Sequence, residues 1–130
     1  MRLVNVQTLK LASFFTRKIP PYAILSHTWE SEELTFYDLE NLSPGVESKL
    51  GYKKLVNACR QAENDGFDYL WIDTCCIDKS SSHELQESIV SMFEWYKRAE
   101  LCYAYISDVE RFTCQREERN WRDDFKKARW

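Results

Sequence analysis

Three short apolar runs alternate with two amphipathic segments along this chain. The runs span 22–25, 69–73 and 101–106, and short runs with few polar interruptions are typical of strands covered on both faces. Residues 51–63 and 85–96 instead repeat apolar side chains every three or four positions, which predicts two amphipathic helices. Strand, helix, strand, helix, strand predicts parallel pairing through right-handed crossovers. We therefore expect an α/β fold with a mostly parallel central sheet and helices on both faces.

The apolar stripe of each predicted helix defines the side that should face the sheet. In the first helix this stripe consists of Tyr52, Leu55, Cys59 and Ala62, while Lys53, Lys54, Arg60 and Gln61 lie mostly elsewhere. In the second helix the stripe consists of Leu85, Ile89, Met92, Phe93 and Tyr96.

Turn signals divide the rest of the chain. Leu3–Val6 is a further apolar run and is predicted to be an edge strand, before two prolines at 20 and 21 interrupt regular structure. We therefore separate a leader strand and linker over 1–21 from a domain over 22–130. Residues 35–42 are expected to form one short helix in an otherwise irregular connection.

The end of the sequence carries a different pattern. From Glu110 to Trp130 charged residues of both signs alternate with Trp121, Phe125 and Trp130, as in an exposed helix with one apolar edge. No cap or turn signal follows, so we expect the chain to be a truncated piece of a longer domain.

Composition narrows the class of protein. The 130 residues suffice for one domain, and 44% are hydrophobic, which argues against general disorder. A net charge of −3 without a basic stripe excludes a typical nucleic-acid binder, and no apolar run is long enough for a membrane span. The five cysteines fit no secreted disulfide framework, so we expect a reducing, cytoplasmic location.

Polar residues follow each predicted parallel strand. They are the segments 26–29, 73–78 and 107–108. Because ligands of open α/β sheets bind at the carboxyl ends of the strands, we expect these segments to share one rim. The candidate ligand-binding residues are Ser26, His27, Trp29, Asp73, Cys76, Asp78 and Ser107.

Each of these residues also has a structural interpretation. His27 is either a general base or a histidine that fixes the turn after a strand, and the structural role is favoured about two to one. Trp29 either stacks on a nucleobase or nicotinamide ring or packs in the core. Asp73 and Asp78 either contact ribose or a metal ion or cap backbone N–H groups. Capping is at least equally favoured for Asp78, whereas Asp73 directly follows an apolar strand and is expected to have a specific partner.

The neighbouring cysteines and Glu84 allow further chemistry. Cys75 and Cys76 are adjacent and no C-x-x-C pair is present, so a metal site with His83 is not expected. A cysteine nucleophile acting with His27, or a redox switch at this pair, is a weaker hypothesis than two thiols that are simply buried. Ser81 and Glu84 match a capping box, which accounts for Glu84 without a catalytic role. The chain has only three glycines, too few for a phosphate-binding loop.

Two motifs give the chain a specific resemblance. The letters LSHTW at 25–29 and WIDTCCIDK at 71–79, together with GYKK at 51–54 and CYAYISDV at 102–109, are similar to the heterokaryon incompatibility (HET) domains of filamentous fungi. The match extends across most of the sequence. It identifies the chain as resembling the N-terminal portion of such a domain.

The resemblance implies a function and a fold. HET domains control vegetative incompatibility, in which fusion of unlike hyphae triggers programmed cell death, through homo-oligomers or other death-signalling proteins. The family resembles Toll/interleukin-receptor (TIR) domains, which implies a TIR- or flavodoxin-like three-layer arrangement and, by analogy, NAD as a substrate that is cleaved. A later W-T-L-Q-E motif and the TIR-type catalytic glutamate are absent from these 130 residues, which leaves Glu84 as the fallback carboxylate. The alternative is a non-enzymatic oligomerising module.

Overall fold

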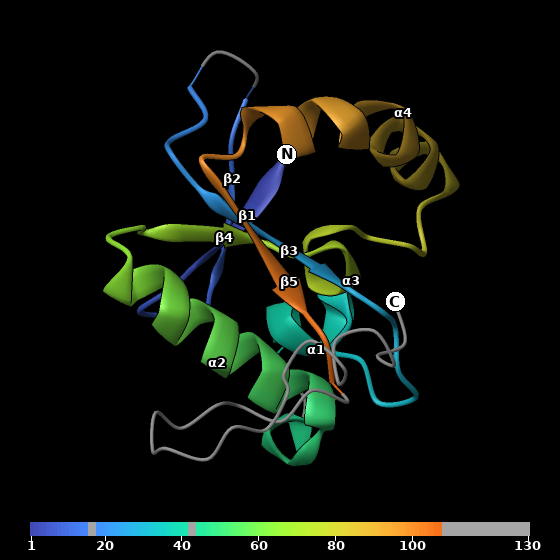
Figure 1. Ribbon diagram of the computed structural model, residues 1–130. Coiled ribbons are helices and arrows are strands. Elements are labelled where there is room, and N and C mark those ends of the chain that lie inside the picture. Colours follow the sequence, from blue (N-terminus) through green and yellow to red (C-terminus); the bar gives the residue numbers. More distant parts are fainter. Residues whose placement is uncertain (16–17, 42–43, 108–130) are drawn as a thin grey trace.

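A computed structural model describes residues 1–15, 18–41 and 44–107 of the chain, which form one five-stranded sheet with flanking helices (Figure 1). The strands lie in the order β2-β1-β4-β3-β5. Their bounds are β1 Arg2–Asn5, β2 Leu11–Ser13, β3 Ala23–His27, β4 Tyr69–Trp71 and β5 Leu101–Tyr105. The two edges of the sheet are therefore β2 and β5.

The sheet is mixed rather than mostly parallel. β3 is parallel to both β4 and β5, as predicted, but β1 runs antiparallel to β2 and to β4. The expectation of an edge strand at Leu3–Val6 was wrong, because β1 lies between β2 and β4. The unpredicted β2 follows a tight turn in which Asn5 Oδ1 accepts the N–H groups of Gln7 and Thr8, and Leu9 has a φ of 55°.

The helices lie on both faces of this sheet (Figure 1). Side chains alternate along β3, so His27 faces Lys54 of α2, whereas Ser26 faces Tyr96 of α4. The 3-10 turn η1 spans Val46–Ser48. The helices are α1 Phe36–Asn41, α2 Leu50–Asn64, α3 Asp73–Cys76 and α4 Ser82–Arg98.

The core fills the space between the sheet and the helices. Trp71 packs edge-on against Trp95 and Tyr96 of α4, and the Tyr22 hydroxyl donates to the Trp95 carbonyl at 2.6 Å. The largest fully buried side chains are those of Trp71, Tyr22, Leu3, Ile24, Leu34, Leu55, Leu70 and Ile72. The predicted strands over 22–25 and 69–73 supply most of them, which explains their near-continuous apolar sequences. The third predicted strand, β5, contributes none and is largely exposed.

Both long helices differ from the predicted stripes. In α2, Lys54 was placed away from the core, yet it is only 3% exposed. In α4, Ile89 and Phe93 were placed in the apolar stripe, yet they are 62% and 74% exposed. The buried side of α4 carries Ser88 instead, flanked by partly buried Leu85, Met92 and Trp95.

The segment after β4 also departs from expectation. The strand predicted over 69–73 ends at Trp71, because residues Asp73–Cys76 form the single turn α3. Half of the predicted capping box is present, since the Ser81 hydroxyl accepts the N–H of Glu84 at 3.4 Å. The Glu84 carboxylate accepts the N–H of Asp78, not that of the cap residue, at 2.8 Å.

Several predicted features lie outside the described residues, namely Asp108, Phe125, Trp121, Trp130 and the proposed helix between 110 and 130. Within the described part of the chain, no helix combines the length and apolarity needed to cross a membrane.

Candidate functional site

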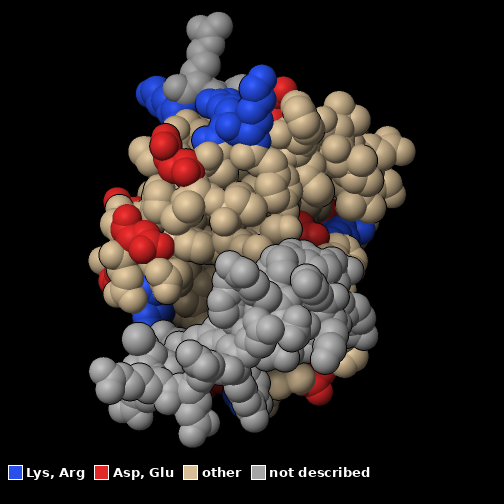
Figure 2. All heavy atoms as spheres, viewed as in Figure 1, with Lys and Arg blue, Asp and Glu red and all other residues tan. Residues whose placement is uncertain are grey.

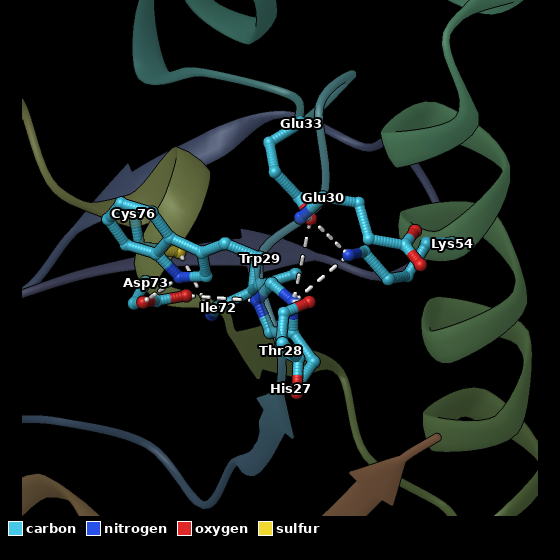
Figure 3. A network of polar contacts seen from close by, with 9 residues as sticks. All are labelled: His27, Thr28, Trp29, Glu30, Glu33, Lys54, Ile72, Asp73 and Cys76. Atoms are coloured by element: carbon cyan, nitrogen blue, oxygen red, sulfur yellow. Dashed lines mark hydrogen bonds and ion pairs between the residues drawn. The ribbon is translucent and has the colours of Figure 1, made fainter. Parts of the chain in front are cut away.

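Asp73 is the centre of a polar network at the carboxyl ends of β3 and β4 (Figure 3). It begins α3, two residues after β4, and faces the end of β3. His27 Nε2 lies 2.9 Å from Asp73 Oδ1, and Trp29 Nε1–H donates to Asp73 Oδ2 at 2.7 Å. Both carboxylate oxygens are thus used to hold the segment that leaves β3.

Lys54 extends the network on the opposite side of His27. Its Nζ lies 3.0 Å from His27 Nδ1 and 2.5 Å from Glu33 Oε1. An ammonium group only donates, so Nδ1 accepts and the ring proton is on Nε2, directed at Asp73. Because both ring nitrogens are engaged, His27 in this arrangement connects Lys54 to Asp73 and has no free lone pair for base catalysis.

The electrostatics keep Asp73 ionised. Burial raises the pKa of this carboxyl. The hydrogen bonds from His27 and Trp29 and the nearby Lys79 ammonium outweigh that effect, so the pKa lies below its usual value. Lys79 lies over the Trp29 ring at 3.3 Å from the centroid, a cation–π contact. Burial lowers the pKa of Lys79, and the charge of Asp73 partly offsets this.

A cavity of about 600 Å³ opens beside this network. Its walls include the aromatic rings of Trp29, Phe36 and Tyr37, and α3 and the residues after it supply Thr74 and Ile77. The size and the mixture of aromatic walls with a few polar groups are typical of small-molecule sites.

The seven predicted ligand-binding residues do not all meet there. Trp29 and Asp78 line the cavity, while His27 and Asp73 form the network that fixes Trp29. Ser26 faces the other side of the sheet beside Tyr96.

The other predicted residues belong to different cavities. Cys76 and Glu84 line a second cavity of about 400 Å³ near the N-terminus. Ser107 lines a third one against α2, with Asn57 and Arg60. The single rim expected for the three strand ends is therefore split, because Ser26 points to the α4 side of the sheet and Ser107 lies farther along α2, in a cavity of its own.

The comparison with known proteins identifies the family. The family described as "Heterokaryon incompatibility protein (HET)" matches residues 22–130. The chain belongs to the HET family. Vegetative incompatibility protein HET-E-1 of Podospora anserina is 49% identical to it over 118 residues, which cover 87% of this chain and 8% of that protein. The chain thus spans a small part of this relative's length, and no solved structure matches it.

The two sequence motifs that carried the HET resemblance build the network. The LSHTW segment supplies His27 and Trp29, and the WIDTCCIDK segment supplies Asp73, Thr74 and Lys79. The two segments come from neighbouring parallel strands. Their contact at the strand ends explains why both are rich in polar residues directly after an apolar run.

The carboxylate of Glu84, the fallback catalytic candidate, is engaged in contacts that hold the fold together. It forms an ion pair with Arg2 and accepts the N–H of Asp78. Arg2 Nε also donates to the Cys76 carbonyl at 3.2 Å, and its guanidinium lies 4.3 Å from the Phe36 ring centroid. Glu84 thereby joins β1 to the start of α4, and it does not line the cavity beside Trp29.

The sequence-based reasoning missed Glu33, Lys54 and Thr74. Lys54 falls three residues after Gly51 and one before Leu55, both buried, so a lysine within the apolar stripe was the available signal. Glu33 lies among other acids and nothing in the sequence sets it apart. Among the described residues, no group of three His, Cys, Asp or Glu side chains could hold a metal ion.

Proposed function

We propose that this chain is a signalling domain of fungal vegetative incompatibility, which acts in self/non-self recognition and programmed cell death. The observation that carries this proposal is the 49% identity with a vegetative incompatibility protein. The free thiols of Cys59, Cys75, Cys76 and Cys102 suit a cytoplasmic location. Homo-oligomers or other death-signalling proteins would be its partners.

A domain exchange tests this proposal. The matched residues of HET-E-1 would be replaced by those of this chain, and incompatibility would be scored after fusion of unlike strains. We expect the chimera to support the reaction and Gly51→Ala to abolish it, because that substitution displaces the segment before α1. A well-expressed chimera without any reaction would contradict the assignment.

The proposed mechanism is TIR-like cleavage of NAD in the cavity beside Trp29. The neighbouring parallel strands β3 and β4 deliver a polar network to their carboxyl ends, where α/β folds bind nucleotides. Trp29 would stack on one ring of NAD, and a carboxylate would stabilise the oxocarbenium-like state as nicotinamide leaves. By the TIR analogy this carboxylate comes from a part of the domain after β5.

Nicotinamide release by the chimera tests this mechanism. Asp73→Asn replaces one of two acceptor oxygens with an NH₂ donor, which then faces the N–H of either Trp29 or His27, and should reduce NAD turnover. His27→Ala is measured in parallel. Unchanged turnover in both variants would remove the network from the mechanism.

The alternative is a non-enzymatic module that assembles with further copies of itself. It is favoured by the outer face of α4, where Val90 is 82% and Phe93 74% exposed. Figure 2 shows few charged side chains over the adjoining surface, and uncharged apolar faces of this kind mark interaction sites. Cell death without NAD loss would support this alternative over cleavage. Val90→Lys should then abolish both assembly and cell death.

A further inference from the structure

Two buried oxygen atoms beside the cavity have no hydrogen-bond partner within the described part of the chain. They are Thr74 Oγ1 and Glu33 Oε2. Both residues line the cavity next to Trp29, and Thr74 is 3% exposed. Buried polar atoms are almost always paired, and leaving one unpaired costs about 1–3 kcal/mol. Each of the two atoms exposes less than 1 Å², so a ligand would supply the missing partners once a neighbouring side chain of the cavity wall moves aside.

The chemistry of Glu33 defines one of these partners. Its Oε1 is occupied by Lys54 Nζ at 2.5 Å and by the N–H of Glu30 at 2.8 Å. The carboxylate is therefore fixed, and Oε2 remains as an acceptor only. Its partner must be an N–H or O–H donor. The Thr74 hydroxyl can donate as well as accept, so it suits a neighbouring ring nitrogen or carbonyl oxygen.

The walls and charges define the rest of the ligand. Trp29, Phe36 and Tyr37 offer aromatic surfaces for a flat ring. The Lys79 ammonium already covers one face of the Trp29 ring, so a ligand ring that stacks there takes the place of a cation. Acidic residues outnumber basic ones in the lining, which disfavours an anionic ring substituent.

We propose that this cavity binds a planar nitrogen heterocycle carrying an exocyclic amino or carboxamide group. The NH₂ group donates to Glu33 Oε2, and Thr74 Oγ1 bonds to a ring nitrogen or to the carboxamide oxygen. The proposal rests on the proposed function only in placing a ligand in the same cavity. Adenine and nicotinamide, the two rings of NAD, both fit this chemistry, and binding of either does not require cleavage.

Calorimetry on the 130-residue chain with matched probes tests the recognition chemistry. Adenosine is compared with purine riboside, which lacks the amino group, and nicotinamide is compared with nicotinate, which carries a carboxylate. We expect one amino- or amide-bearing ring to bind, and its counterpart to bind about tenfold more weakly, as for a hydrogen bond to a charged group. Whichever ring binds identifies the end of the dinucleotide that this cavity holds.

Thr74→Val is the decisive variant, with Thr74→Ser as its matched control. Valine keeps the branched shape and removes a hydroxyl without a partner, so the variant should fold and melt at the same or a higher temperature. We expect ligand affinity to fall about fivefold in Thr74→Val and to be retained in Thr74→Ser.

The proposal would be overturned if neither ring bound, if nicotinate bound as tightly as nicotinamide, or if Thr74→Val bound like the unmodified chain. These results separate it from the proposed function. Ring binding without NAD loss in the chimera would leave the inference standing and remove NAD cleavage. NAD cleavage that is insensitive to Thr74→Val would leave the function standing and remove the inference.

Discussion

Gly51 in α2 is the position where one added methyl group should be most damaging. A Cβ built on its backbone would lie 2.4 Å from the Leu34 nitrogen, 2.7 Å from the Glu32 oxygen and 2.9 Å from the Glu33 carbonyl carbon. All three are main-chain atoms, and the Gly51 N–H donates to the same Glu32 oxygen at 2.9 Å. The Gly51→Ala methyl group can be accommodated only by moving the 32–34 segment.

The size of the effect follows from two opposing terms. Glycine to alanine within an exposed helix normally stabilises a protein by about 1 kcal/mol. Ordinary contact begins near 3.4 Å, so here the backbone must shift by about 1 Å, and overpacking of this kind costs about 1–3 kcal/mol or more. Leu34 is fully buried, so the shift also disturbs the core. The clash is with main-chain atoms, so we place its cost at the upper end, about 3 kcal/mol, which leaves a net loss of about 2 kcal/mol of unfolding free energy.

Urea denaturation measures this loss, with two other glycines as controls. Gly45 and Gly66 have φ values of +80° and +85° and no atoms within 4 Å of an added Cβ, so alanine there should cost only about 1 kcal/mol of backbone strain. Gly51→Ala should be the least stable of the three, and should also weaken ligand binding because Glu33 moves. An equal or higher stability than that of the unmodified chain would refute the packing of 32–34 on α2.

Three other predictions test the network and the thiols. Lys54→Met leaves the Glu33 carboxylate without its buried partner and should cost about 3 kcal/mol of unfolding free energy; a urea midpoint like that of the unmodified chain would contradict the ion pair. The pKa of Asp73 is lowered in the folded state. Its stabilising contribution is therefore present above the pKa of the unfolded state and is lost as the pH falls through the pKa of the folded state. Asp73→Asn should therefore flatten the acid limb of a curve of unfolding free energy against pH. Burial raises the pKa of Cys59 to about 12, so iodoacetamide should alkylate exposed Cys102 before Cys59 in peptide mass spectra, and equal rates would disprove this burial.

The sequence predicts the central part of the fold better than its margins. The three parallel strands and both long helices could be predicted because apolar runs and helical periodicity are local signals. β2 has three residues and is defined by its pairing with β1, which no local pattern encodes. The antiparallel half of the sheet and the interior place of β1 follow from that same pairing. The exposed apolar residues of α4, such as Phe93, show that periodicity locates an apolar stripe without saying which part of it is covered.

The candidate site was predictable to a similar extent. Trp29 and Asp73 could be singled out because polar residues directly after buried strands mark ligand sites in α/β folds. The split of the expected rim could not, because it depends on the face to which Ser26 points and on the part of α2 that lies beside Ser107. Glu33 and Thr74 could not be predicted for another reason. Each has a buried oxygen atom without a hydrogen-bond partner among the described residues, and only the packed structure shows that.

Burial of Lys54 links these observations. Taking an ammonium group out of water is costly, and a buried ion pair gives little net stability over an apolar pair. The lysine does, however, fix two groups at once, since it holds Glu33 in the cavity wall and sets the tautomer of His27, which in turn bonds to the carboxylate that holds Trp29. Glu33 and Trp29 are the acceptor and the stacking surface of the proposed ring site. Precise placement of these two side chains therefore accounts for a buried charge that stability alone does not explain.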